Sequence, residues 1–87
     1  MTRLVSIDGT LSPPDEARVS VYDRGFLYGD SVFETVRTYG GEPFALAEHM
    51  ARLARSASRV GIAMPVSAAD FGMEVRVAVR AARNTES

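Results

Sequence analysis

The 87-residue sequence contains no lysine, because all ten residues counted as lysine or arginine are arginines. Cysteine is also absent, which excludes disulfide bonds and thiolate metal sites from these residues. No stretch approaches the roughly 18 apolar residues of a membrane-spanning helix, and the opening MTRLVSIDG has no long apolar run. We therefore expect a cytoplasmic protein with no membrane partner and no metal site.

The composition is that of an ordinary globular domain. Hydrophobic residues make up 46% of the chain and charged residues 24%, and the formal net charge of −1 does not indicate a nucleic-acid partner. A chain of this length suits one small domain, which buries only about 60% of the surface that its unfolded form exposes. We expect residues 1–87 to form a single domain of marginal stability.

Turn signals divide the first half of the chain into short strands. Asp8-Gly9 between apolar residues favours a tight hairpin, because both central positions of that turn need a positive φ. Gly40-Gly41 marks a second turn between a stretch rich in β-branched and aromatic residues and a return strand. The predicted strands flank Asp8-Gly9 and cover residues 19–22, 32–39 and 42–46.

The second half of the chain has a helical period. Apolar residues recur at three- and four-residue steps in an amphipathic helix that Gly61 ends; they are Leu46, Met50, Leu53, Ala57 and Val60. Ser67 can cap a second helix, although residues 73–79 also alternate as a strand would. The polar residues 84–87 indicate an exposed connector. The predicted fold is α+β, with antiparallel strands first and two helices after.

Two motifs carry a resemblance to a known family. The segment DRGFLYGDSVFETVR at residues 23–37, followed by EHMARL at 48–53, resembles the class IV aminotransferases, which are the fold-type IV pyridoxal-phosphate enzymes. The resemblance covers nearly the whole chain, in order, and matches only the small N-terminal domain of a longer polypeptide. It implies a pyridoxal 5′-phosphate cofactor, amino acid and 2-oxo acid substrates, and a homodimer.

The resemblance assigns Arg52, in the H-x-x-R-L motif, to binding the cofactor phosphate. A guanidinium offers paired donors that match phosphate oxygens, and it stays charged at any working pH. The alternative is a solvated arginine paired with Glu48, one turn earlier on the helix. His49 shares the side of the helix that carries Arg52, and we expect it to orient a neighbour by hydrogen bonding rather than to transfer protons.

The resemblance places Tyr28, Phe33 and Arg37 in the substrate pocket. Strand alternation puts Phe33 and Arg37 on one face and Glu34 on the other. The aromatic rings would contact an apolar substrate side chain, and Arg37 would lie near a carboxylate. Plain core packing is the alternative for the rings, and exposure or pairing with Glu34 or Asp30 is the alternative for Arg37.

The polar residues of the glycine-rich run indicate architecture rather than chemistry. Asp23 and Arg24 are placed to tie a turn by hydrogen bonds, and no G-x-G-x-x-G spacing supports a phosphate-cradling loop. Acid–base catalysis by Asp23 and Asp30 is not expected, because nothing positions a substrate between them.

The run Ser31-Val32-Phe33-Glu34 is similar to that of branched-chain aminotransferases, although Thr35 departs from the glycine usual there. We expect transamination of branched-chain L-amino acids with 2-oxoglutarate first, a D-amino-acid aminotransferase second and aminodeoxychorismate lyase third. A non-catalytic dimerisation or ligand-binding module is the alternative of another class. Intact Arg52, Tyr28 and Phe33 argue against such a decayed relative.

All three activities need a lysine that holds the cofactor and moves protons at the substrate α-carbon. In the family this lysine belongs to the large domain, beyond the position equivalent to Ser87. The resemblance therefore implies that the small domain is incomplete at its C-terminal end and that this chain holds no catalytic residue. It also implies a lysine-bearing polypeptide as the partner and no turnover by residues 1–87 alone.

Overall fold

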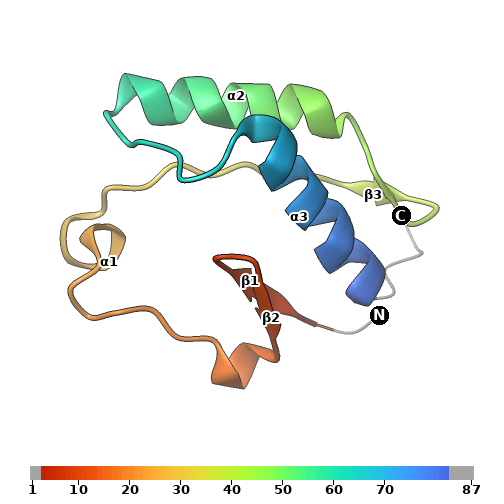
Figure 1. Cartoon of the computed structure of the whole chain (residues 1–87), viewed down its shortest axis with the longest axis horizontal. Coiled ribbons are helices and arrows are strands. Elements are labelled where there is room, and N and C mark those ends of the chain that lie inside the picture. The colour runs from red at the N-terminus through yellow and green to blue at the C-terminus, as the bar shows by residue number, and fades with distance from the viewer. Residues whose placement is uncertain (1–2, 83–87) are drawn as a thin grey trace.

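The computed structural model describes residues 3–82 and has two pairs of antiparallel strands followed by two long helices (Figure 1). This arrangement confirms the predicted α+β fold. Helix α2 lies along one side of the molecule, and α3 runs away from it toward the first hairpin. The connector predicted at residues 84–87 lies outside the described residues.

The first hairpin is built as the sequence predicts. Strands β1 (Val5–Ile7) and β2 (Thr10–Ser12) pair with Ile7 opposite Thr10, and a two-residue turn joins them. Asp8 has a φ of 52° and Gly9 a φ of 80°, the left-handed pair that this turn requires. A short 3-10 helix, Pro14–Glu16, follows.

The strand predicted at residues 19–22 is wrong, because a local turn forms there instead. The carbonyl of Ser20 accepts a hydrogen bond from the Asp23 amide at 3.1 Å, and the Ser20 hydroxyl accepts one from the Tyr22 amide at 3.0 Å. These local bonds engage the Ser20 carbonyl and the Tyr22 amide, two backbone groups that a strand would offer to a neighbour. The short helix α1 (Arg24–Tyr28) follows and was not predicted.

The long strand predicted at residues 32–39 is reduced to β3 (Thr38–Tyr39). Residues 31–36 have no strand partner in the described part of the chain, so their backbone forms no ladder. The carbonyl of Arg37 accepts a hydrogen bond from the Phe44 amide at 2.7 Å, next to the short strand. The predicted alternation nevertheless persists. Val32, Glu34 and Val36 are half-buried, whereas Phe33, Thr35 and Arg37 are exposed.

The second hairpin pairs β3 with β4 (Glu42–Pro43) through the turn at Gly40-Gly41. The predicted return strand at 42–46 is shorter than expected because α2 already begins at Leu46. The ring of Phe44 meets that of Tyr39 edge to face, with centroids 5.4 Å apart.

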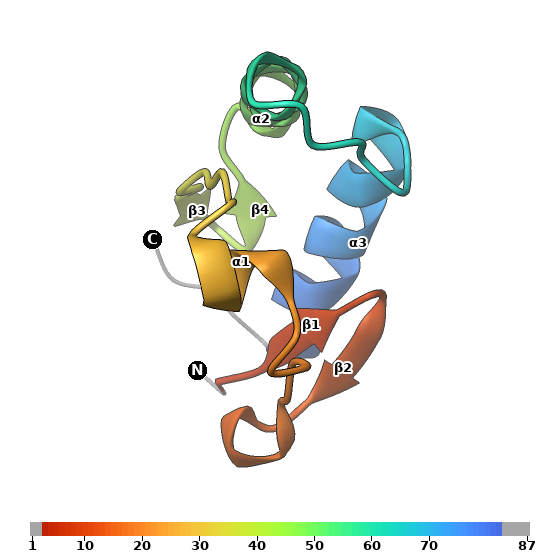
Figure 2. The ribbon, with the colours of Figure 1, turned by 90° about the vertical axis from the view of Figure 1, so that its left-hand side faces the viewer.

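The two predicted helices are confirmed as α2 (Leu46–Arg59) and α3 (Ala68–Ala81). The hydroxyl of Ser67 caps α3 by accepting a hydrogen bond from the Asp70 amide at 3.1 Å, so the strand alternative for this segment is wrong. Figure 2 shows α2 end-on, with α3 beside it and the first hairpin farther away. No helix within residues 3–82 is long and apolar enough to cross a membrane.

The core is small and centred on α2. Its buried apolar residues are Leu46, Met50, Leu53 and Ala57, which are four of the five predicted for this face; Val60 is 60% exposed. Val32, Phe71 and Val75 pack against this cluster. The core therefore ties the extended segment and α3 to α2, which fixes the position of the neighbouring polar residues.

Candidate functional site

The carboxylate of Glu34 lies at the centre of a polar cluster with His49 and Arg52. Arg52 donates from Nε to Glu34 Oε2 at 2.9 Å and from Nη2 to Oε1 at 2.7 Å. The Nδ1 atom of His49 lies 2.7 Å from the same Oε1. The cluster joins α2 to the extended segment 31–37.

Local structure explains why these three side chains meet. His49 and Arg52 are three residues apart on α2, so they lie on the same side of the helix. Glu34 is one of the half-buried residues of the extended segment. Val32, two positions earlier on the same side, packs against the core. Packing of Val32 against α2 therefore brings Glu34 within reach of both residues.

The electrostatics of the cluster favour its charged form. Hydrogen bonds from Arg52 and then from His49 lower the pKa of Glu34 from 4.5 to about 2, and the Glu34 carboxylate in turn raises the pKa of Arg52. The side chain of Glu34 is 12% exposed and that of Arg52 is 58% exposed. Glu34 is thus an ionised, largely covered carboxylate that holds a more exposed cation.

Arg52 keeps part of its guanidinium available. Its Nε and Nη2 atoms engage Glu34, whereas Nη1 has no hydrogen-bond or ion-pair partner within residues 3–82. Two N–H groups on Nη1 and an exposed side chain suit the oxygens of an anion such as a phosphate. The ion pair of Arg52 is with Glu34, whereas Glu48, the predicted alternative partner, adds only a weaker electrostatic attraction that also raises the pKa of Arg52.

Tyr28, Phe33 and Arg37 lie apart from this cluster. Phe33 is 84% exposed on the side of the segment opposite to Glu34, and Tyr28 is 69% exposed on α1. The guanidinium of Arg37 has no polar partner in the described range, since Glu34 binds Arg52 and Asp30 binds Arg24. The structure therefore brings His49 to Arg52 but leaves the three predicted pocket residues on open surface.

The glycine-rich run is held by its own polar residues, as predicted. The Asp23 carboxylate accepts a hydrogen bond from the Gly25 amide at 2.9 Å and caps α1. Arg24 donates to Asp30 from Nη2 at 2.8 Å, and its guanidinium carbon lies 5.4 Å from the centre of the Tyr28 ring. Asp23 and Asp30 thus have structural partners.

Glu34 is the site residue that sequence reasoning missed. Strand alternation placed Glu34 on the face of the segment that Phe33 does not share, and that face is the covered one. A carboxylate at such a position was the sequence signal that could have identified Glu34. A carboxylate at a covered position needs a partner. Arg52 and His49 were available as that partner.

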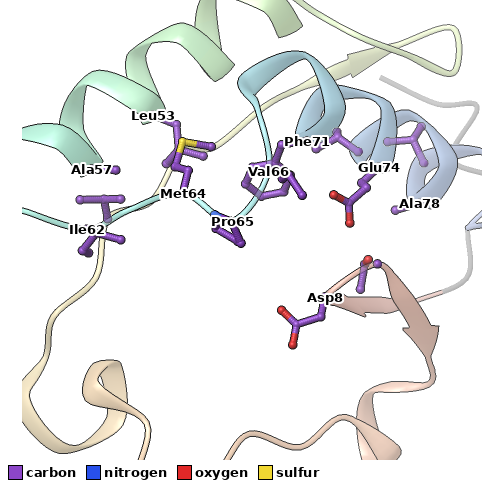
Figure 3. Close-up of a pocket in the computed structure, with 15 residues that line it drawn as sticks. Asp8, Leu53, Ala57, Ile62, Met64, Pro65, Val66, Phe71, Glu74 and Ala78 are labelled. Carbon is purple, nitrogen blue, oxygen red and sulfur yellow. The ribbon is translucent and has the colours of Figure 1, made fainter.

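A separate apolar groove of about 620 Å³ lies between the tip of the first hairpin and helices α2 and α3. Figure 3 shows Leu53, Ile62, Met64 and Phe71 at this groove, with Asp8 on the hairpin side. None of Tyr28, Phe33, Arg37 and Arg52 lines it. The groove is an uncovered part of the core rather than part of the polar cluster.

Comparisons with known proteins point to one family. The family model described as "Amino-transferase class IV" matches residues 31–86. A D-alanine aminotransferase of Staphylococcus aureus (strain N315) is 40% identical over 58 residues, which are 67% of this chain and 21% of the relative. A D-alanine aminotransferase of Bacillus licheniformis is 39% identical over 72 residues, 83% of this chain and 25% of the relative.

A third relative, from Methanocaldococcus jannaschii, has a name that gives branched-chain-amino-acid aminotransferase as a provisional assignment. It is 43% identical over 63 residues, which are 72% of this chain and 22% of the relative. The matched part of the chain thus spans about a fifth to a quarter of the length of these relatives. The comparisons concern a short segment of much longer proteins.

Proposed function

Because the chain belongs to the amino-transferase class IV family, we propose that residues 1–87 are the small domain of a cytoplasmic, homodimeric aminotransferase that uses pyridoxal phosphate. The enzyme would transfer an amino group between an amino acid and a 2-oxo acid. The observation that carries this proposal is the arginine of the H-x-x-R-L motif, which Glu34 holds on one side while Nη1 stays available.

The cofactor, when bound, supplies an electron sink that lets the substrate α-carbon lose a proton. The role of residues 1–87 would be to bind and orient the cofactor and the substrate. Arg52 would hold the cofactor phosphate through its remaining N–H groups, with further phosphate donors in the rest of the enzyme. A guanidinium with two free N–H groups on one nitrogen fits that role.

Phe33 and Arg37 would form one wall of the substrate pocket, with Tyr28 beside them. Their exposure on one side of the segment 31–37 supports this assignment, because a pocket wall needs side chains that the core does not use. Phe33 would contact the apolar side chain of the amino acid, and Arg37 would attract its carboxylate or that of the 2-oxo acid.

A lysine-bearing polypeptide is part of the proposal, since residues 1–87 contain no lysine. Two features of the described residues support such a partner: residues 31–36 run without a strand partner, and the apolar groove beside α3 is uncovered. Added strands would pair with the extended segment and cover apolar surface.

Two substrate classes have support. The Ser31–Glu34 run favours branched-chain L-amino acids, and the names of the Staphylococcus and Bacillus relatives favour a D-amino acid. The test is a transamination assay of the complete enzyme with 2-oxoglutarate and, in turn, L-leucine, L-isoleucine and D-alanine. Turnover with one class identifies it, and no turnover with any amino donor by the cofactor-loaded enzyme would overturn the proposal.

A further inference from the structure

We propose that Glu34 is a positioning residue that fixes the orientation of the Arg52 guanidinium, with His49 as the second element of the clamp. The contacts themselves are observed. The inference rests on the proposed function only for the identity of the anion that Arg52 binds. Glu34 would touch neither the cofactor nor the substrate and would act through Arg52.

The pair between Glu34 and Arg52 has the geometry that fixes a guanidinium plane. The two hydrogen bonds, 2.9 Å from Nε and 2.7 Å from Nη2, join different nitrogens to different carboxylate oxygens. One contact would leave the plane free to rotate, whereas two parallel contacts define its direction. Because the Arg52 side chain is 58% exposed, the covalent chain alone would leave its tip mobile.

The proton on His49 follows from the same geometry. Nδ1 lies 2.7 Å from an ionised carboxylate oxygen, and two lone pairs at that distance would repel, so Nδ1 carries hydrogen and donates to Glu34. The 3.2 Å approach of Arg52 Nη2 to Nδ1 is then a contact between two donors that share Oε1. His49 therefore holds the carboxylate rather than the guanidinium.

Glu34 itself is held by the fold. Its side chain is 12% exposed, and Val32, two residues earlier on the same side of the segment, packs against the buried cluster of α2. The core thus positions Glu34, and Glu34 in turn positions the guanidinium of Arg52. A site built this way keeps its anion-binding donors oriented before the anion arrives.

The charge of Glu34 by itself would have the opposite effect on anion binding from its proposed positioning of Arg52. The negative carboxylate of Glu34 repels a bound phosphate, so a purely electrostatic role would weaken anion binding, whereas a positioning role strengthens it. Glu34→Asp separates the two roles because it keeps the charge and withdraws the carboxylate by one methylene. A change in phosphate recognition in this variant reports position rather than charge.

The experiment uses the complete enzyme stripped of cofactor, and it compares the affinities of pyridoxal phosphate and of pyridoxal, which lacks the phosphate. We expect Glu34→Asp to weaken the binding of pyridoxal phosphate about tenfold, which corresponds to the loss of roughly one charge-assisted contact. The affinity for pyridoxal should be unchanged. An unchanged ratio of the two affinities, whether both affinities fall together or neither falls, would overturn the inference.

Two control variants complete the design. Glu48→Asp shortens an exposed carboxylate on α2 by the same methylene and should leave the ratio as in the parent enzyme. Arg52→Ala separates the two hypotheses. If it leaves the ratio intact, the proposed phosphate role fails; if it abolishes the phosphate preference while Glu34→Asp does not change it, only the positioning role fails.

His49 offers a second route should Glu34→Asp not yield a folded enzyme. Asparagine places an N–H near the position of Nδ1, whereas leucine removes the donor. We expect His49→Leu to lower the ratio of the two affinities and His49→Asn to preserve most of it. Equal ratios in the two variants would contradict a clamp that depends on the Nδ1 donor.

Discussion

Glu34 Oε2 accepts a hydrogen bond from Arg52 Nε at 2.9 Å, although 18 positions separate the two residues along the chain. This contact joins the extended segment 31–37 to α2 beside the core. Arg52 is therefore oriented by the fold, unlike an unpaired surface arginine.

Arg52→Ala should reduce the affinity of the complete enzyme for pyridoxal phosphate by about tenfold or more, because a charge-assisted contact to the phosphate is lost. Absorbance of the retained cofactor after dialysis measures this loss. Arg55→Ala is the matched control, since Arg55 is an exposed arginine one turn further along the same helix. Equal cofactor retention by the two variants would remove Arg52 from the site.

Phe33→Ala should reduce kcat/KM for leucine far more than for alanine of the same chirality, because a pocket wall of this kind contacts the longer apolar side chain. Phe33 is 84% exposed, so its truncation removes little core packing. Initial-rate assays with both amino donors measure the effect. An equal loss for leucine and alanine would indicate damage to the fold rather than to a specificity pocket.

The stability of the protein should depend on Glu34 in acid. Its folded pKa is about 2, against 4.5 as the ordinary value, so the unfolded chain binds the proton more readily between these limits. The stabilisation is complete above about pH 4.5 and is lost as the pH falls toward 2. Urea unfolding from pH 2 to 6 measures the free energy of unfolding of the parent and of Glu34→Gln. The difference between the two free energies should shrink as the pH falls from 4.5 toward 2, and a difference that stays constant with pH would contradict this role of Glu34.

Gly72→Ala should stabilise the protein by about 0.5–1 kcal/mol, because glycine is unfavourable inside a helix such as α3. A Cβ at this position would lie 3.5 Å from Met50 Cγ, an ordinary van der Waals distance. Gly61→Ala is the opposing control, since Gly61 has a φ of 77° and alanine is strained there by about 1 kcal/mol. Thermal unfolding should therefore shift in opposite directions, and a destabilised Gly72→Ala would show that α2 and α3 pack too closely for a methyl group.

Local signals predicted the parts of the fold that local interactions determine. Asp8-Gly9 specifies its hairpin through backbone conformation, and the apolar spacing from Leu46 to Ala57 defines the buried face of α2. Helix α1 was missed although its signals are present, with Asp23 as the cap and Gly29 in the left-handed conformation at the end.

The strands could not be predicted to the same degree, because a ladder needs a partner as well as suitable residues. Residues 32–36 have the composition and the alternation of a strand but lack a paired strand in the described residues. The cluster of Glu34, His49 and Arg52 also depends on contacts between segments that are distant in the sequence. Motif resemblance identified Arg52, whereas only the packing of Val32 against α2 brings Glu34 to it.

The division of roles between Arg52 and a lysine outside residues 1–87 is tested most directly by borohydride reduction of the active enzyme and peptide mass spectrometry. Reduction fixes the cofactor to the amine that holds it, and residues 1–87 offer no lysine amine. We predict that the cofactor mass lies on one lysine outside these residues and on no peptide within them. Cofactor mass on the amino terminus of this chain, or an active enzyme with no modified lysine, would contradict the proposed function.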